Sequence, residues 1–524
     1  MTDLSSRLPQ HVLLYDVTLR DGNQTPGVGF TLEDKLEISQ KLDSLRIDFI
    51  EGGWPYSSLT DVTFFQKAKD LELEHAKIVA FGSTRHSKNP VNKDPNLELL
   101  LKCDADIITI FGKSSEEQAR EVLKTTPETN LTMIGESIDY LKDHGFITFF
   151  DAEHYFDGFK INPDYSLETL KAAKNADAII LCDTNGGFIP EMIEFVVNKS
   201  RQKIGGKVCG IHCHNDSGLA NANTIAALKC GLTQIQGGFC GMGERAGNVD
   251  FCELLPTLRY KYNYQTISDA NMRKLKSYAD YFERISGFKM PLNKPYVGNY
   301  VFKHTGGIHA DGVLKFAKAY EHINPELVGN RRDFTLSDQA GSASIVAVAE
   351  KFGFKLNKKD PVVKKILNNV KGRHHITDTQ LYLLLAEERE KKPLPFELID
   401  YKLMDSKGEK PRTWVKVRIE KRDWEEISEG VGPVHSFDCA LRKVLSRHLT
   451  AKIEKVQLTS YHVTIHQEEK GTAALTEVSI GFRANGERGS TIGESEDILK
   501  ASVPPLVDAY TYFLFKMNSH SNGI

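Results

Sequence analysis

The chain has 524 residues, of which 40% are hydrophobic and 26% charged, and its formal net charge is −3. This length is too great for one hydrophobic core and predicts two or three domains, while the balanced charge gives no electrostatic case for a nucleic-acid partner. No apolar run is long enough to span a bilayer, so we expect a cytoplasmic protein without a membrane partner.

Eight β-rich runs alternate with amphipathic helical stretches over the first half of the chain. In the first helical stretch, Leu32, Leu36 and Leu42 recur at helical spacing. The runs cover residues 12–19, 47–52, 77–82, 105–111, 146–153, 178–182, 207–214 and 234–240. Eight β/α units in about 250 residues predict an α/β fold, the (β/α)8 TIM barrel, which we place at residues 10–266. An open doubly wound sheet is the alternative, but no Gly-x-Gly-x-x-Gly motif follows the first run.

Reactive side chains follow these runs. They are Arg20 and Asp21, Glu51, Lys113, Glu153, Thr184, His212 and His214, Glu244 and Arg245, and Asn248. Because ligands bind beyond the carboxyl ends of the strands in a barrel, we expect the active site at this edge.

Two histidines, His212 and His214, stand near the end of the seventh run. Residues i and i+2 project from the same face of a strand, so one metal ion can bind both imidazoles. A pair of hydrogen-bonded surface histidines is the alternative. With Asp21 as a third ligand, the set suits Mn²⁺, Mg²⁺, Zn²⁺ or Co²⁺. Cys209 and Cys213 have the opposite parity, and we expect them to face the outer helices.

The neighbouring residues suit a reaction of a 2-oxo acid, because its keto and carboxylate oxygens can chelate such an ion. Arg20 can stabilise an oxyanion that develops on the keto group, although a salt bridge to Asp16 or Glu51 is the alternative. Thr184 can donate a hydrogen bond to the substrate carboxylate, or serve only as a helix N-cap. Carbon–carbon bond formation also needs a base and an acid, for which Glu153 and a histidine are candidates.

Helical, charged segments replace the alternation at residues 267–391, which we predict to form an accessory region. The glycine-rich segment 304–312 within it is either a loop that presents polar side chains or an ordinary surface turn. A charge run at 387–392, followed by Pro393-Leu394-Pro395, predicts a linker. Alternating segments after it predict a small α+β domain at 395–517, which we expect to bind a regulator or a partner subunit.

Three motifs stand out together: DVTLRDGNQ at 16–24, HCHNDSGLA at 212–220 and GERAGN at 243–248. In this order they resemble the family of 2-isopropylmalate, homocitrate and citramalate synthases. The segments IEGGWP at 50–55, DAEHYFDG at 151–158 and CDTNGG at 182–187 are most similar to the citramalate synthase branch. That branch condenses acetyl-CoA with pyruvate and water to give (R)-citramalate and CoA for isoleucine biosynthesis. The resemblance covers nearly the whole chain and implies a metal-dependent acyltransferase.

The resemblance implies roles for individual residues of the barrel. Asp21, His212 and His214 would bind the divalent metal, with Asn248 as a fourth ligand or close neighbour. Arg20 would polarise the keto group of the oxo acid.

Further roles concern the substrates and the subunits. Thr184 would hold the carboxylate of the oxo acid, and Gln24 would lie near acetyl-CoA, the co-substrate. Glu153 and His309 would form the catalytic base pair, with Tyr320 nearby. In the family the accessory region reaches the barrel of the partner subunit, which implies a homodimer. The C-terminal domain is similar to an allosteric domain that binds an end product such as isoleucine or leucine.

One position departs from the family pattern: Ser342 stands where relatives usually carry an arginine. It lies outside the catalytic motifs, so it puts interdomain packing or coupling in doubt more than the chemistry. The alternatives keep the fold. They are a synthase for 2-oxoisovalerate or 2-oxoglutarate, a 3-hydroxyacyl-CoA lyase, and a binding protein without catalysis. The long C-terminal part argues against the lyase, and the intact candidate ligands argue against a loss of catalysis.

Overall fold

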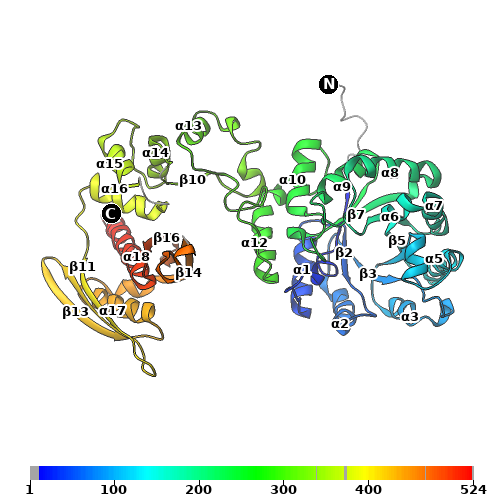
Figure 1. The fold of residues 1–524 in the computed structure, drawn as a ribbon, viewed down its shortest axis with the longest axis horizontal. Coiled ribbons are helices and arrows are strands. Elements are labelled where there is room, and N and C mark those ends of the chain that lie inside the picture. Colours follow the sequence, from blue (N-terminus) through cyan, green and yellow to red (C-terminus); the bar gives the residue numbers. More distant parts are fainter. Residues whose placement is uncertain (1–10, 338, 371–374, 467, 485, 522–524) are drawn as a thin grey trace. The chain divides into compact units, whose positions relative to one another are not determined.

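The computed structural model describes residues 11–521 apart from 338, 371–374, 467 and 485. The chain forms two compact units, each of which is described by itself (Figure 1). The first unit extends to Phe302 and takes in Ile323–Arg331, whereas the second contains Lys303–His322 and the chain from Arg332 onward.

Eight parallel strands in the first unit pair in chain order, and β8 closes the barrel on β1. The strands are β1 Leu13–Asp16, β2 Phe49–Gly53, β3 Lys77–Ser83, β4 Ile107–Lys113, β5 Ile147–Glu153, β6 Ala178–Asp183, β7 Val208–Cys213 and β8 Gln234–Gly237. The TIM barrel that the alternating pattern predicts is therefore confirmed.

Helices connect the strands on the outside of the barrel (Figure 1). They are α1 Leu32–Ser44, α2 Leu59–Ala68, α3 Pro95–Lys102, α4 Glu116–Glu121, α5 Pro127–Asp143, α6 Tyr155–Ile161, α7 Pro163–Ala172, α8 Pro190–Ile204, α9 Ala220–Lys229 and α10 Phe251–Tyr262. Two more helices, α11 Asp269–Met272 and α12 Leu275–Ser286, complete this unit. Local capping encodes several helix starts, as at α3, where the Asp94 side chain accepts hydrogen bonds from the N–H groups of Asn96 and Leu97.

Neighbouring strand residues alternate between two apolar layers. The inner cluster contains Tyr15, Val79, Ile107, Phe149 and Ile180. The outer core, between the strands and the helices, contains their neighbours Leu14, Ile78, Ile108, Phe150 and Ile179. Because both faces of each strand are buried, the strands appear in the sequence as nearly continuous apolar runs.

Some details of the strands differ from the expectation. β1 ends at Asp16 because its carboxylate accepts hydrogen bonds from the N–H and the hydroxyl of Thr18, which turns the chain. β8 ends at Gly237, and the following chain turns at Cys240, whose φ of 62° is incompatible with an extended strand. Cys209 packs with the inner cluster, contrary to the parity argument, because the β6–β7 register shifts between Ile179 and Ile180.

The second unit combines helices with two antiparallel sheets. Its longer elements are α13 Gly307–Lys315, α14 Ser342–Lys351, α15 Pro361–Val370, α16 Asp378–Glu388, β11 Glu397–Met404, β12 Arg412–Ile419, β13 Arg422–Glu429, α17 Pro433–His448, β14 Gln457–His466, β15 Leu475–Ala484, β16 Glu487–Ser495 and α18 Ile498–Ser521. The short strands β9 Lys303–His304 and β10 Asp333–Phe334 pair with each other.

Each sheet of the second unit is covered by a helix. The sheet β11-β12-β13 packs against α17, and the sheet β14-β15-β16 packs against α18. One apolar core joins both sheets to α14, α15 and α16.

Ser342 is the first residue of α14, and no described contact explains its place there. The domain limits 10–266, 267–391 and 395–517 stay predictions.

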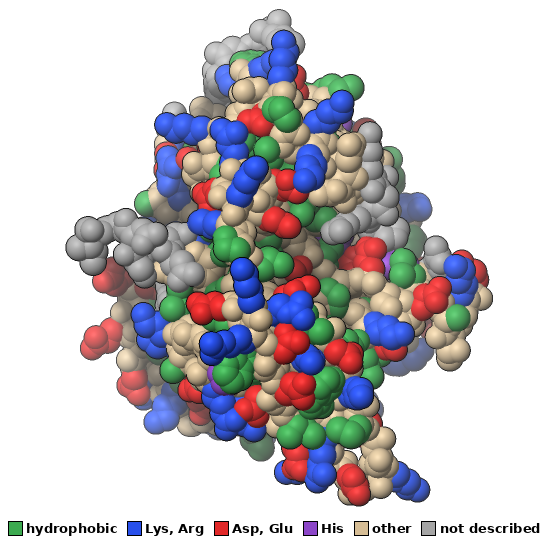
Figure 2. Space-filling view, turned by 90° about the vertical axis from the view of Figure 1, so that its left-hand side faces the viewer, with side chains coloured by type: hydrophobic (Ala, Val, Ile, Leu, Met, Phe, Trp, Pro, Cys, Tyr) green, Lys and Arg blue, Asp and Glu red, His purple; other side chains and the backbone are tan. Residues whose placement is uncertain are grey.

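Basic and acidic side chains are interspersed on the side seen in Figure 2. Within the described part of the chain, no helix has the length and apolar character needed to cross a membrane.

Candidate active site

Three side chains that can bind a metal meet at the carboxyl ends of β1 and β7, the two strands that flank β8 in the barrel. Asp21 lies in the turn after β1, His212 is on β7, and His214 is one residue beyond the end of β7. The two Nε2 atoms are 3.3 Å apart, and each is 3.9 Å from Oδ2 of Asp21. All three side chains are buried, and their candidate ligand atoms lie within 4.8 Å of one another. One ion can therefore contact all three residues.

The electrostatics hold these groups in the protonation states that a metal requires. Burial disfavours the charge of Asp21, but Arg20 and the two imidazoles outweigh it and hold the pKa of Asp21 well below its usual value. Burial lowers the pKa of His212 to about 3 and also lowers the pKa of His214. At neutral pH the site thus presents one carboxylate and two neutral imidazoles, the forms that bind divalent ions.

A hydrogen-bonded chain behind His212 fixes the orientation of its ring. Nδ1 of His212 is 2.9 Å from Oε1 of Gln236, and Nε2 of Gln236 donates to Oδ1 of Asp151 at 3.0 Å. Burial, together with the charge of Glu51, raises the pKa of Asp151 to about 8. Because Oε1 of Gln236 accepts a hydrogen bond from the Nδ1–H of His212, Nε2 of His212 keeps its lone pair for a metal.

Asn248 lies next to one of these candidate ligands through backbone pairing. It pairs with His214 through an isolated β-bridge, and its side chain is buried. Among the described residues, Oδ1 of Asn248 has no hydrogen-bond partner. A buried amide oxygen without a partner is costly, and coordination of an ion would satisfy it. The residues present therefore fit a divalent metal.

Arg20 lies against this group, held by two carboxylates and an aromatic ring. Its Nε donates to Oε2 of Glu51 at 2.5 Å, and its Nη1 donates to Oδ2 of Asp21 at 3.0 Å. The guanidinium carbon is 3.9 Å from the ring centroid of Phe81. Tyr15 donates to the other oxygen of Glu51 at 2.7 Å. The salt bridge to Glu51 that the sequence left open is thus present, and it orients the cation toward the ligands.

Arg20 and the three candidate ligands line a cavity of about 190 Å³, together with Glu153, Thr184 and Gln24. Glu153 forms an ion pair with Lys113 at 2.5 Å. The hydroxyl oxygen of Thr184 accepts the backbone N–H of His154 at 2.7 Å, which leaves the hydroxyl hydrogen to donate to a ligand. Gln24 is exposed at the rim.

Aromatic rings form one wall of the cavity. Trp54 packs edge-on against Phe81 and Phe111, with ring centroids 6.1 and 5.6 Å apart, and the two phenylalanines stack at 5.3 Å. The polar groups Arg20 and Thr184 thus share a small, partly apolar cavity with the three ligands. Such a cavity suits a small anion with an apolar substituent.

His309 and Tyr320 belong to the second unit. His309 is on α13 and Tyr320 follows that helix, and their exposed rings lie 4.3 Å apart between centroids. The structure therefore brings these two residues together, whereas their pairing with Glu153 stays a prediction.

Sequence reasoning missed several residues of the site, chiefly Gln236, Asp151 and Trp54. Gln236 is a polar residue at a fully buried position of β8, but its pairing with His212 depends on the register of β7 and β8, which the sequence does not display. Trp54 follows β2 directly, which is the place where ligands bind in a barrel.

Three family models match successive parts of the chain. One described as HMGL-like matches residues 11–280, one described as homocitrate synthase post-HMGL domain-like matches 296–377, and one described as the LeuA allosteric (dimerisation) domain matches 375–514.

Curated proteins match over nearly their full length. The chain is 41% identical to the (R)-citramalate synthase of Aquifex aeolicus (strain VF5), over 97% of this chain and 99% of that protein. It is 39% identical to the (R)-citramalate synthase of Geobacter sulfurreducens, over 96% and 98% of the two chains. It is 33% identical to the 2-isopropylmalate synthase of Methanocaldococcus jannaschii, over 97% and 96%.

Proposed function

Because the chain belongs to the HMGL-like family, among the (R)-citramalate and 2-isopropylmalate synthases, we propose that it condenses acetyl-CoA with pyruvate and water to give (R)-citramalate and free CoA. The observation that carries the proposal is the convergence of three metal ligands, Arg20, Glu153 and Thr184 on one cavity of about 190 Å³. The matches to (R)-citramalate synthases at 41% and 39% identity favour pyruvate over 2-oxoisovalerate.

Asp21, His212 and His214, with Asn248, hold a divalent ion such as Mn²⁺, Mg²⁺, Zn²⁺ or Co²⁺. When bound, the ion supplies Lewis-acid polarisation of a keto group. Arg20 stabilises the oxyanion that develops on the keto oxygen, because its charge is fixed beside Asp21. Thr184 donates its hydroxyl hydrogen to the carboxylate of the oxo acid.

Glu153 is the base that takes a proton from the methyl group of acetyl-CoA, near Gln24. The resulting carbanion attacks the keto carbon, and the new alkoxide takes up a proton. His309, with Tyr320 beside it, is the partner of Glu153 in these proton transfers. Hydrolysis of the thioester then releases CoA. The aromatic wall favours the methyl substituent of pyruvate over longer side chains.

The C-terminal part binds an amino-acid end product, isoleucine or leucine, and holds two copies of the chain together. The match of residues 375–514 to an allosteric and dimerisation domain supports this part of the proposal. Isoleucine is the end product expected for an enzyme that makes citramalate from pyruvate.

Product identification tests the reaction. The purified protein, incubated with acetyl-CoA and ¹³C-labelled pyruvate, should form labelled (R)-citramalate, which NMR and chiral chromatography identify. Formation of 2-isopropylmalate from 2-oxoisovalerate, in preference to citramalate from pyruvate, would overturn the choice of oxo acid and leave the reaction class intact.

A further inference from the structure

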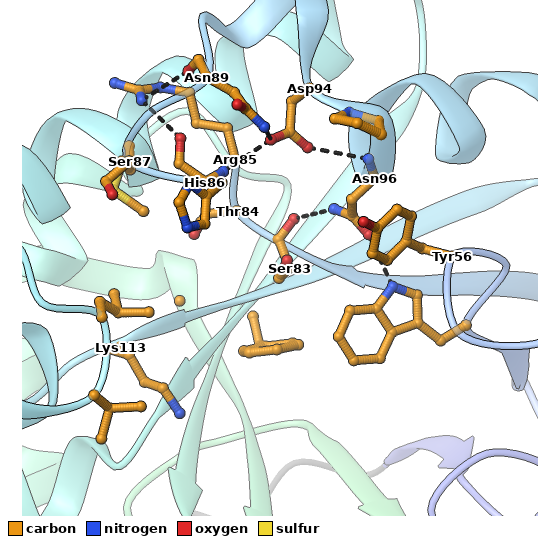
Figure 3. A pocket seen from close by; sticks show the side chains of 17 residues that line it. Tyr56, Ser83, Thr84, Arg85, His86, Ser87, Asn89, Asp94, Asn96 and Lys113 are labelled. Atoms are coloured by element: carbon orange, nitrogen blue, oxygen red, sulfur yellow. Dashed lines mark hydrogen bonds between the residues drawn. The ribbon is translucent and has the colours of Figure 1, made fainter.

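A second, larger cavity lies beside the substrate cavity. Its volume is about 450 Å³, and its lining comes largely from the loops after β3 and β4, including Thr84, His86 and Lys113 (Figure 3). Both cavities are lined by Trp54 and Phe111. These two rings are therefore the partition between a small space next to the candidate metal ligands and a larger neighbouring space.

The indole of Trp54 is held at this partition by a hydrogen bond. Nε1 of Trp54 donates to Oδ1 of Asn96 at 2.8 Å, and Nδ2 of Asn96 donates to the carbonyl oxygen of Ser83 at 2.7 Å (Figure 3). Asn96 is buried in the first turn of α3, where its N–H donates to the capping Asp94. Ser83 ends the strand that carries Phe81. The ring of Trp54 is thus tied to the strand that forms the rest of the aromatic wall.

The backbone of Trp54 is fixed independently. Its N–H donates to Oδ2 of Asp61 at 2.9 Å, and Asp61 forms an ion pair with the buried Lys35. Lys35 also donates to the carbonyl oxygen of Gly52 at 2.9 Å. Gly53 has a φ of 143°, and a Cβ there would lie 2.3 Å from the carboxylate of Asp61. Trp54 is therefore anchored at both its main chain and its ring, as a wall residue that must keep its position would be.

The closed barrel also fixes the direction in which a substrate side chain points. Thr184 follows β6 and Trp54 follows β2, and these strands lie four apart in a closed barrel of eight. The two residues therefore stand on opposite sides of the mouth. An oxo acid whose carboxylate binds Thr184 directs its substituent toward Trp54.

We infer that Trp54 determines which 2-oxo acids the site accepts, and that Asn96 is the positioning residue that holds its indole across the opening to the larger cavity. This inference rests on the proposed function, since it concerns the substrate of that site. With the partition in place, only a small substituent fits. Without it, the side chain of a larger oxo acid extends into the neighbouring space.

The test compares oxo acids of increasing size with the full chain and Mn²⁺. The readout is the ratio of kcat/KM for 2-oxobutyrate and 2-oxoisovalerate to that for pyruvate, followed by release of the CoA thiol. Trp54→Ala should raise this ratio by about tenfold or more, because one methylene of pocket space is worth about 10- to 200-fold in discrimination. Asn96→Ala should raise the same ratio by a smaller factor, because it lowers KM for the larger acids.

Two further variants separate position from general damage. Asn96→Asp keeps an oxygen acceptor for the indole but loses the donor to Ser83, so it should raise the ratio less than Asn96→Ala does. Tyr56 lines only the larger cavity and is exposed, so Tyr56→Ala enlarges that space without opening the partition and should leave the ratio unchanged.

An unchanged ratio in Trp54→Ala, with pyruvate turnover retained, would overturn the inference. If a variant is folded but does not turn over, calorimetry measures its dissociation constant for 2-oxoisovalerate instead. The inference requires that the variant bind this acid more tightly than the unmodified chain does. If Trp54→Ala does not fold, the same two measurements on Asn96→Ala decide. Absence of CoA release from the unmodified chain with pyruvate would instead contradict the proposed function, and the binding measurement would still test the partition.

Discussion

Replacing Gln236 with leucine should weaken metal binding about 10- to 100-fold, although Gln236 is not itself a ligand. Oε1 of Gln236 accepts a hydrogen bond from the Nδ1–H of His212 at 2.9 Å, and Nε2 of Gln236 donates to Asp151 at 3.0 Å. Leucine removes that acceptor, so a metal bound at Nε2 forces His212 to keep its proton on an unpaired, buried Nδ1, at a cost of about 1–3 kcal/mol that the metal-free ring avoids by moving the proton to Nε2. The expected loss of affinity corresponds to about 1.4–2.8 kcal/mol, so the two estimates agree.

A titration with Mn²⁺, followed by the electron paramagnetic resonance of the free ion, measures this effect without turnover. Gln234→Leu is the matched control, because Gln234 is also buried on β8, two positions earlier, and contacts none of the ligands in the part of the chain described. Similar thermal unfolding of the two variants would exclude a general loss of structure. A dissociation constant of Mn²⁺ for Gln236→Leu within twofold of the control value would refute the argument that the hydrogen bond to Gln236 orients His212.

Three further outcomes follow from the structure. Glu153→Gln should lower kcat about 10²- to 10⁴-fold with little change in KM for pyruvate, as removal of a general base does; a loss below tenfold would assign the base elsewhere. Burial raises the pKa of Asp16 to about 7, far above its value in the unfolded chain, so folding favours the protonated carboxyl. The free energy of unfolding should therefore fall as the pH rises from about 4 to 7, by at most about 4 kcal/mol. Asp16→Asn should flatten that decline in urea unfolding, and an unaltered slope would contradict the cause. Isoleucine or leucine should inhibit CoA release, and no response to either would contradict the proposed regulation.

The barrel was predictable because strands buried on both faces leave a strong signal. Runs such as Ala178–Asp183 are apolar almost throughout, and eight of them alternate with helical stretches. The cluster of Asp21, His212 and His214 was predictable for a related reason. Asp21 and His212 are far apart in sequence, but each follows or ends a strand, and a closed barrel brings strand ends together.

The parts that escaped prediction depend on pairings between distant segments. Gln236 acquires its role only through the register that places it opposite His212. Trp54 is held by Asn96 from α3 and by Asp61 from α2, and nothing local to Trp54 indicates either contact. Cys209 changed faces because of a single register shift between β6 and β7, which a strict alternation of side chains cannot anticipate.

Release of free CoA from acetyl-CoA tests the central claim most directly. Pyruvate, 2-oxobutyrate, 2-oxoisovalerate and 2-oxoglutarate are compared at equal concentration, with and without EDTA. From the structure and from the proteins that match the chain, we expect the fastest release of CoA with pyruvate. Chelation should abolish that release, and addition of Mn²⁺ should restore it. Release that is unaffected by EDTA would contradict the metal site, and no release with any of the four acids would contradict the proposed reaction.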